Sequence, residues 1–483
     1  MLKEVKLLIG GKQVAASNGA TIDRIDPFTG EIASRAAAAT LEDADAAVAA
    51  AQAAFPAWKA LSAGERRQRL SRAADLMDQA TPRFIEIGVA ETGGTGMWYG
   101  FNVMLAANML REAAAMTTQI TGEIMPSEVP GSMAMAVRAP VGVVLGIAPW
   151  NAPVILGIRA LAMPLACGNS VVLKAAENCP AVHALIGEVL QEAGLGDGVV
   201  NVVTNAPKDA PAIVERLIAN PAVRRVNFTG STQVGRIVAQ HAAKHLKPVL
   251  LELGGKAPLL VLHDADLDEA VAAANFGAFA NQGQICMSTE RLIVDKKVAD
   301  QFVEKLAAKA SALVAGDPRT KVHLGPLVSV DAAQRIKALV DEAVSKGARV
   351  ACGGKVEGAV MQATVVDGVT PAMKLYSEES FGPVVSVIRA EDDEDAIRIA
   401  NDSPFGLSSA VFSQDVARAL DIAGRIEAGI CHINGPTVHD EANMPFGGVK
   451  DSGYGRFGSK ASIAEFTELR WVTLQKTHRH YPF

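Results

Sequence analysis

Short apolar segments alternate with helical stretches from Val141 onward, and no other feature of the sequence constrains the fold as strongly. The expected strands span Val141–Ile147, Ser170–Leu173, Val199–Val203, Arg225–Phe228 and Val249–Leu253. The helices between them lie near Ile158–Ala166, Pro180–Ala193, Ala210–Ala219 and Val234–His245. Apolar strands joined by helices form a parallel sheet that is covered on both faces. A second series of this kind runs from Ala270 to about Ile433, so we expect an α/β fold.

The N-terminal part has a different pattern. Lys6–Ile9 and a strand near Val14 flank Gly10-Gly11, a dipeptide typical of a β-hairpin turn. Helices follow, because two pairs of residues resemble capping boxes before helical runs: Thr40 with Asp43, and Ser62 with Glu65.

Size and charge limit the classes of function. The chain has 483 residues, more than one hydrophobic core usually serves, so we expect two or three domains. The net charge of -6 argues against nucleic acid or an anionic membrane as the main partner. Charges at Lys3, Glu4 and Lys6 do not fit a signal peptide, and no apolar run approaches the ~20 residues that span a bilayer. A cytoplasmic protein is therefore expected.

One cysteine stands in a context that favours chemistry. The chain has five cysteines, an odd number without a CxxC pair, so neither a zinc site nor a disulfide framework is expected. Cys286 lies among glycine and small polar residues in Gly283–Thr289, as an exposed, activated thiolate requires. Cys431 lies in an expected strand, which favours a structural role. His432 beside it would point to the opposite face, so a cysteine–histidine protease pair is disfavoured.

Polar or glycine-containing segments directly follow three expected strands. They are Pro149-Trp150-Asn151, Lys174 and Phe228–Ser231. The carboxyl ends of parallel strands line one ligand crevice, so these segments are expected to converge. Gly230–Gly235 leads from a strand into a helix, where backbone N–H groups and the helix dipole favour a phosphate. It lacks the GxGxxG pattern, and a tight turn that binds nothing stays an alternative.

Two carboxylates are candidates for function. Glu177 lies three residues after Lys174, where a solvated surface pair is one interpretation and adenosine-ribose recognition is the other. A carboxylate on the ribose would repel a 2′-phosphate and favour NAD over NADP. Glu252 lies between two leucines at the end of an apolar strand, and burial would raise its pKa toward that of a general base. The alternative is an ion pair with a nearby lysine.

Seven segments occur along the chain in one order. They are Pro149-Trp150-Asn151, Lys174-Ala175-Ala176-Glu177, Phe228-Thr229-Gly230-Ser231-Thr232, Leu251-Glu252-Leu253-Gly254-Gly255-Lys256, Gly283-Gln284-Ile285-Cys286, Glu378-Glu379-Ser380-Phe381-Gly382-Pro383 and Pro445-Phe446-Gly447-Gly448. In this order and spacing they resemble the motif series of the aldehyde dehydrogenase superfamily, and they cover nearly the whole chain.

The resemblance implies a reaction and its residues. Cys286 would attack the aldehyde, Asn151 and the Cys286 N–H would stabilise the oxyanion, and Glu252 would activate water to hydrolyse a thioester. Glu379 would bind the nicotinamide ribose and Phe381 would pack beside the ring. No metal is implied. The NAD contacts would come from Ile147, Trp150, Lys174, Glu177, Gly230, Ser231, Leu253, Glu379 and Phe381.

The substrate expectation rests on a narrower resemblance, to bacterial salicylaldehyde, vanillin and benzaldehyde dehydrogenases. It is carried by Gly283–Arg291, His432–Gly435, Gly453–Phe457 and the ending Tyr481-Pro482-Phe483. Ala152 would leave room for a ring, and Arg159 would stack on it or bond a phenol oxygen. Ordinary helix packing or ion pairing is the alternative for each pocket residue. The expected pocket residues are Trp98, Tyr99, Arg159, Ile285, Met287 and Val438.

The resemblance also implies an architecture. Residues 1–118 and 138–250 would bind NAD, residues 251–448 would form the catalytic domain, and residues 119–137 and 449–483 would be oligomerisation segments. Gln119–Val137 and a strand near Arg470–Gln475 would pair with a partner subunit, because an exposed sheet edge needs covering. A homodimer, or a tetramer built from two dimers, is expected.

Other functions stay open. A broad-range, aliphatic or semialdehyde dehydrogenase would share every motif. A coenzyme A-acylating dehydrogenase would not need the Glu252 base, and a structural use of the fold predicts a lost nucleophile or base. A reductase working from acid derivatives is also conceivable, because direction depends on supply.

Overall fold

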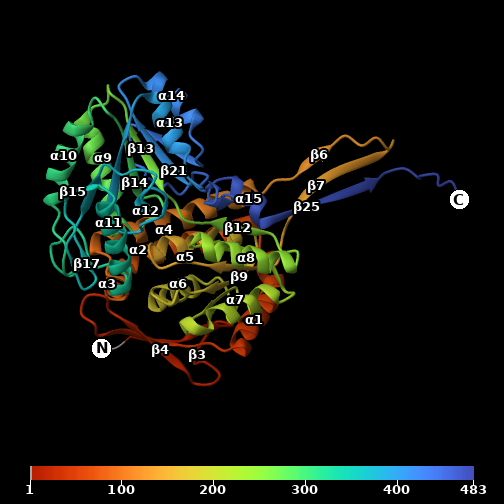
Figure 1. Ribbon diagram of the computed structural model, residues 1–483. Helices are drawn as coiled ribbons and strands as arrows, with labels where there is room; N and C mark the ends of the chain where they lie inside the picture. The colour runs from red at the N-terminus through yellow and green to blue at the C-terminus, as the bar shows by residue number, and fades with distance from the viewer. Residues whose placement is uncertain (1–2) are drawn as a thin grey trace.

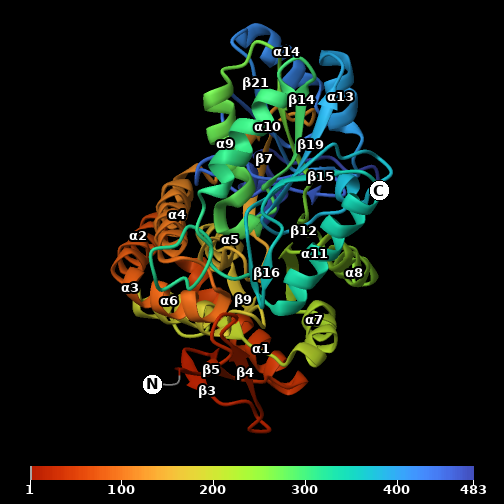
Figure 2. The same cartoon turned by 60° about the vertical axis from the view of Figure 1, so that its left-hand side comes forward.

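The computed structural model describes residues 3–483. Met1 and Leu2, which open the segment considered above as a leader, lie outside the described residues. Two α/β regions lie one above the other, and a β arm projects from between them (Figures 1 and 2). Within the described part of the chain, no helix has both the length and the apolar character needed to cross a membrane.

The first sheet confirms the alternation read from the sequence. Its strand order is β24-β12-β11-β8-β9-β10-β2-β3. The five inner strands are parallel: β8 (Val143–Ile147), β9 (Ser170–Lys174), β10 (Val200–Val203), β11 (Val223–Thr229) and β12 (Val249–Glu252). The edges are antiparallel: β2 (Leu7–Ile9) and β3 (Lys12–Val14), which form the expected hairpin, and β24 (Gly453–Tyr454).

Helices cover both faces of this sheet. Val144 and Leu145, neighbours in β8, pack into different hydrophobic cores because successive strand residues face opposite sides. One side holds α2 (Ala63–Gln79), α3 (Thr81–Thr92), α4 (Gly96–Met116), α5 (Pro153–Ala166) and α6 (Pro180–Glu192). The other holds α1 (Leu41–Ala60), α7 (Ala210–Ala219) and α8 (Thr232–Lys244).

Local signals at helix starts were informative to different degrees. The capping boxes at Thr40 and Ser62 are both formed, at the starts of α1 and α2. The expected start of a helix near Ile158 is wrong, because α5 begins at Pro153. Proline is favourable in the first helical turn, where its missing N–H has no intrahelical partner to lose.

The second sheet has the order β15-β18-β19-β14-β13-β21-β22. All pairs are parallel except β15 (Arg349–Cys352) on β18 (Thr364–Asp367). The other strands are β13 (Ala257–Val261), β14 (Thr289–Asp295), β19 (Val384–Ala390), β21 (Ser408–Phe412) and β22 (Ile430–Ile433). Its covering helices are α9 (Leu267–Phe279) and α10 (Ala299–Ser311) on one face, and α11 (Val330–Ser345), α13 (Asp393–Asn401) and α14 (Val416–Arg425) on the other.

Smaller elements complete the chain. They are β1 (Lys3–Val5), β4 (Thr21–Ile25), β5 (Ile32–Ala37), β16 (Val356–Glu357), β17 (Val360–Met361), α12 (Lys374–Ser377), β20 (Phe405–Gly406), β23 (Val449–Lys450) and α15 (Ala461–Phe466), with short 3-10 turns η1 (Thr117–Gln119), η2 (Pro207–Asp209) and η3 (Ala280–Gly283).

The projecting arm is an antiparallel sheet in the order β25-β7-β6 (Figure 1). It contains β6 (Glu123–Met125), β7 (Ser132–Pro140) and β25 (Thr467–Gln475), which pairs with β7 over its full length. The expected strand near Arg470 therefore begins earlier, at Thr467. Residues before it lie on the body instead of the arm, since β24 pairs with β12. The domain limits given above stay a prediction.

Candidate active site

Cys286 follows a short run of residues whose backbone is in the left-handed conformation. Asn281, Gln282 and Gly283 all have positive φ, of 47°, 56° and 68°, directly after α9. The Ser288 hydroxyl donates to the Gly283 carbonyl at 3.0 Å and closes the turn. The sequence predicted this loop setting. Cys286 is half-buried, and its side chain faces a large cavity.

Asn151 follows β8 and is fixed against the cysteine turn. Its side-chain Nδ2 donates to the Gln284 carbonyl at 2.9 Å. Its own carbonyl accepts from the Trp98 indole at 3.0 Å and from Asn281 Nδ2 at 2.9 Å. Asn151 and Cys286 line the same cavity. One amide hydrogen of Asn151 is used by Gln284, and the other is available to an oxygen bound beside Cys286.

Glu252 ends β12 and is buried. Among residues 3–483, neither of its carboxylate oxygens has a hydrogen-bond partner. Burial raises the pKa of Glu252 to about 8, although the positive charges of Arg159 and Arg456 oppose the rise. The alternative of a lysine partner is wrong, because Lys256 pairs with Glu290.

The Cys286 thiol is electrostatically coupled to this carboxylate. Burial raises the pKa of Cys286, the charges of Glu252 and Glu379 raise it further, and Arg159 opposes them. The structure therefore corrects the expectation of an exposed, activated thiolate, because the Cys286 thiol is half-buried and loses its proton less readily than a free cysteine. Glu252 is outside the set of described residues that line the cavity, yet its charge acts on the sulfur. Cys431, in β22, is half-buried among apolar side chains, as expected of a structural cysteine.

Two glycines allow these segments to meet. A Cβ on Gly255 would lie 2.2 Å from the Cys286 carbonyl oxygen, and one on Gly254 would lie 2.6 Å from Glu379 Oε2. The Gly255 N–H donates to Glu379 Oε1 at 2.8 Å. The backbone after Glu252 therefore touches both the cysteine turn and the loop that carries Glu379.

Lys174 and Glu177 are not a solvated pair. Lys174 ends β9, is 5% exposed and forms an ion pair with Glu177. Asn205 Nδ2 also donates to Glu177 Oε1, at 3.0 Å. Burial opposes ionisation of Glu177, but Lys174 and Asn205 outweigh it and hold the pKa below its usual value. The result is a preorganised carboxylate at the carboxyl edge of the first sheet.

A phosphate could lie at the start of α8. Gly230 follows β11, and its N–H donates to the Glu252 carbonyl at 3.0 Å. Ser231 is the exposed N-cap residue of α8, and its hydroxyl accepts from the Val234 N–H. Leu253 packs against this helix at Gly235, where a Cβ would lie 2.3 Å from Leu253 Cδ2. Ile147 ends the adjacent buried strand β8.

The nicotinamide-side candidates also converge. The rings of Trp150 and Phe381 meet edge to face, with centroids 5.7 Å apart. Phe381 has a positive φ of 49°, which is unusual for an aromatic residue. Burial and the nearby charge of Glu290 raise the pKa of the half-buried Glu379 to about 7, and the Gly255 N–H opposes the rise. Together with the adenosine-side groups, these residues fit a dinucleotide.

The cavity beside Cys286 has a volume of about 840 Å³, within the range of small-molecule sites. Five of the six expected pocket residues line it: Trp98, Arg159, Ile285, Met287 and Val438. Ala152, which was expected to leave room for a ring, lines it as well.

Arg159 gives this cavity a buried positive charge. It forms an ion pair with Asp440, and the two side chains are 5% and 9% exposed. Its guanidinium carbon lies 4.1 Å from the Phe446 ring centroid, in cation–π geometry. Burial raises the pKa of Asp440, and Arg159 opposes the rise.

The expected place of Tyr99 in the pocket is wrong. It was expected beside Trp98 as a wall of the pocket, but it is fully buried and is not among the described residues that line the cavity. A Cβ on Gly88 would lie 2.1 Å from the Tyr99 ring, and the Tyr99 hydroxyl bonds Thr92 Oγ1 at 2.7 Å. Successive helix residues point about 100° apart, so Tyr99 turns toward α3 while Trp98 faces the cavity.

Sequence reasoning missed three residues around the site. Phe446 lies in the segment Pro445–Gly448 and Glu290 in Gly283–Arg291, but neither residue was expected to have a role of its own. Asp440 carried no local signal, because its partner Arg159 is 281 residues away. Only the fold brings this pair together.

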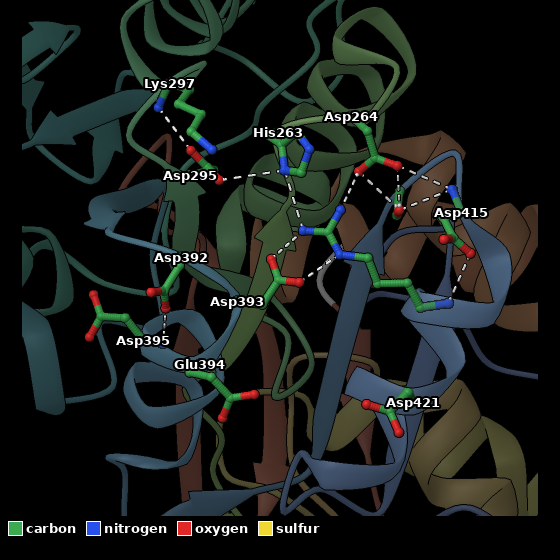
Figure 3. A network of polar contacts seen from close by, with 12 residues as sticks. His263, Asp264, Asp295, Lys297, Asp392, Asp393, Glu394, Asp395, Asp415 and Asp421 are labelled. Carbon is green, nitrogen blue, oxygen red and sulfur yellow. Dashed lines mark hydrogen bonds and ion pairs between the residues drawn. The ribbon is translucent and has the colours of Figure 1, made fainter.

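A network of charged side chains lies at the carboxyl ends of two strands of the second sheet (Figure 3). Arg418 pairs with Asp393 and Asp264 and lies 3.3 Å from His263, which is itself 3.8 Å from Asp295. His263 and Asp264 follow β13, and Asp295 ends β14, so this network covers the carboxyl ends of the strands. Cys286 precedes β14, at the other end. Within residues 3–483, no group of three or more His, Cys, Asp or Glu has the arrangement of a metal site.

The comparisons with known proteins agree with this geometry. Residues 14–472 match the aldehyde dehydrogenase family. The chain is 68% identical over 480 residues to a vanillin dehydrogenase of Pseudomonas fluorescens, covering 99% of each. It superposes with a TM-score of 0.98 on a salicylaldehyde dehydrogenase of Pseudomonas putida G7 complexed with salicylaldehyde, at 49% identity and 100% coverage of both chains.

A betaine aldehyde dehydrogenase of Staphylococcus aureus in complex with NAD+ is also similar. The TM-score is 0.94 and the identity 30%, and the match covers 98% of this chain and 95% of that one. The family match spans nearly the whole chain and two relatives exceed 30% identity at full coverage, so this protein belongs to the aldehyde dehydrogenase family.

Proposed function

We propose that the protein oxidises an aromatic aldehyde of the vanillin, salicylaldehyde or hydroxybenzaldehyde class to its carboxylic acid, with NAD as the oxidant. The observation that carries the proposal is the apolar cavity of about 840 Å³ that ends at Cys286 and Asn151 and contains the buried Arg159–Asp440 pair. An aromatic ring suits the apolar walls. A ring oxygen suits the single buried guanidinium, which donates but cannot accept hydrogen bonds.

The chemistry assigns one task to each central residue. The Cys286 sulfur adds to the aldehyde carbon, and the proton of the thiol is released to solvent water. The amide of Asn151 and the backbone N–H of Cys286 stabilise the oxyanion. NAD, when bound, would supply the hydride acceptor, and loss of hydride from the Cys286 adduct would leave a thioester. Glu252 then takes a proton from the water that attacks this thioester, and the acid and the thiol are released.

The substrate class is tested by steady-state kinetics. We expect kcat/KM with NAD to be about tenfold or more higher for hydroxylated benzaldehydes than for aliphatic aldehydes of similar length, since about 1.4 kcal/mol of binding difference suffices. Coenzyme A should not change the rate. Equal or better use of the aliphatic aldehydes would contradict the aromatic assignment.

The role of Glu252 is tested by Glu252→Gln. Without the base, one equivalent of NADH should form in a burst, and the steady rate should then fall by about 10²–10⁴-fold. In the unchanged protein, hydrolysis should accelerate as pH rises through about 8, because only the ionised Glu252 accepts a proton. Stopped-flow absorbance of NADH measures both. Cys286→Ala is the control that should lose the burst as well, and undiminished steady turnover by Glu252→Gln would reject the assignment.

Preference for NAD over NADP is proposed to rest on Glu177. Its ionised carboxylate, paired with Lys174, would accept bonds from the adenosine ribose and repel a 2′-phosphate. Glu177→Ser removes the repulsion and frees the Lys174 cation, so the ratio of kcat/KM for NADP to that for NAD should rise about tenfold or more. Glu192→Ser, an exposed change in α6, is the control. An unchanged ratio in Glu177→Ser would count against the ribose role.

We also propose that the protein is a homo-oligomer, a dimer or a pair of dimers, formed through the arm. The arm carries exposed apolar side chains: Ile124 is 74% exposed, Leu469 60% and Trp471 79%. Trp471→Glu places a charge on this face and should lower the mass measured by light scattering. Tyr454→Glu, which alters a half-exposed aromatic on the body, is the comparison. A wild-type protein that is already monomeric would refute the proposal.

A further inference from the structure

We propose that Glu290 is a positioning residue for the nicotinamide half of the cofactor. It holds the backbone of the loop that carries Glu379 and Phe381. The inference rests on the proposed function, because it takes Glu379 to bind the nicotinamide ribose. The residue itself touches neither the cavity nor the reacting atoms, so its effect on the reaction would be exerted through this loop.

The contacts of Glu290 account for both of its carboxylate oxygens. It lies in β14, four residues after Cys286, and is 3% exposed. The Ser380 N–H donates to Oε1 at 3.0 Å and to Oε2 at 2.8 Å, and the Phe381 N–H donates to Oε1 at 3.0 Å. Lys256 forms an ion pair with Oε2 and is itself 2% exposed. A buried carboxylate is thus satisfied by two consecutive backbone N–H groups and one cation.

Glu290 explains the unusual backbone of the loop. Phe381 has a φ of 49°, which a residue with a side chain adopts only when its surroundings hold it there. Consecutive N–H groups in such a conformation form a concave anion site. Glu290 fills that site from within the protein. The backbone that presents the Phe381 ring to Trp150 is therefore held by a carboxylate of another strand.

The same carboxylate joins three segments of the site. Lys256 follows the two glycines after Glu252, Glu290 follows the cysteine turn, and Ser380 belongs to the loop that carries Glu379 and Phe381. Arg291 strengthens this junction, because its guanidinium donates to the Lys256 carbonyl at 3.1 Å. A carboxylate in this place can align the nucleophile, the base and the cofactor loop with one another.

The alternative is that Lys256 and Glu290 are simply a buried ion pair of the core. Such a pair would affect folding, and its loss would weaken every ligand alike. A positioning role would affect only the ligand that reaches the loop. The loop has a second attachment, because Arg335 of α11 donates to the Ser380 carbonyl at 2.6 Å. Loss of Glu290 should therefore loosen the loop without releasing it.

The experiment compares NAD with ADP, which carries only the adenosine half, by isothermal titration calorimetry on the full-length protein. In Glu290→Gln the side chain keeps only one acceptor oxygen, and this oxygen cannot accept hydrogen bonds from Lys256 and from both N–H groups of the loop. The Kd of NAD should rise about tenfold or more, and the Kd of ADP should stay within about twofold. Glu391→Gln, which alters an exposed ion pair on Lys296, is the matched control and should change neither.

A second variant covers the case in which Glu290→Gln leaves Lys256 buried without a partner and the protein fails to fold. Lys256→Met with Glu290→Met removes both charges and keeps the volume, a replacement that buried ion pairs often tolerate. This double variant should show the same selective loss of affinity for NAD. An unchanged Kd for NAD in a folded variant, or an equal loss of affinity for NAD and ADP, would overturn the inference.

Glu379→Gln separates this inference from the function on which it rests. If Glu379→Gln weakens the binding of NAD and the Glu290 variants do not, the positioning role of Glu290 is rejected and the cofactor assignment stands. If Glu379→Gln leaves NAD binding unchanged, the cofactor assignment of the loop falls, and the role of Glu290 falls with it.

Discussion

The site depends on the close approach of the Gly254-Gly255 backbone to the backbone of the cysteine turn and to the side chain of Glu379. A side chain at Gly255 would force the backbone to move, because its Cβ would lie 2.2 Å from the Cys286 carbonyl oxygen, and a Cβ on Gly254 would lie 2.6 Å from Glu379 Oε2 and displace that carboxylate. The backbone that follows Glu252 is therefore in contact with both the cysteine turn and the loop that carries Glu379. The proposed base, nucleophile and cofactor contact are thus held together where the chain passes from β12 of the first sheet to β13 of the second.

Burial then sets the chemistry of these groups. Glu252, Glu379 and Cys286 all have raised pKa values, and Arg159, a buried cation that lines the cavity, opposes the rise in Glu252 and Cys286. A carboxyl group with a pKa of about 8 can exchange a proton with a thiol or a water near neutral pH. The pairing of Arg159 with Asp440 holds that cation in place at the wall of the cavity.

Much of the fold and the centre of the site could be predicted from the sequence, because their signals are local. Apolar strands, the hairpin at Gly10-Gly11 and two capping boxes each involve neighbouring residues. Glu252 was recognisable as a buried carboxylate because leucines flank it. Features that depend on distant contacts were not accessible: the partner of Arg159 is 281 residues away, that of Glu290 is 34 to 91 residues away, and the direction of Tyr99 depends on a glycine in another helix.

The central claim is that the aldehyde carbon becomes bonded to the sulfur of Cys286 during turnover. Mass spectrometry of the protein, quenched in acid while it turns over an aromatic aldehyde with NAD, tests this most directly. The account predicts the added mass of the acyl group on the peptide that contains Cys286, and on none of the peptides with Cys167, Cys179, Cys352 or Cys431. NADH production with no acylated cysteine, or with the acyl group on another cysteine, would contradict it.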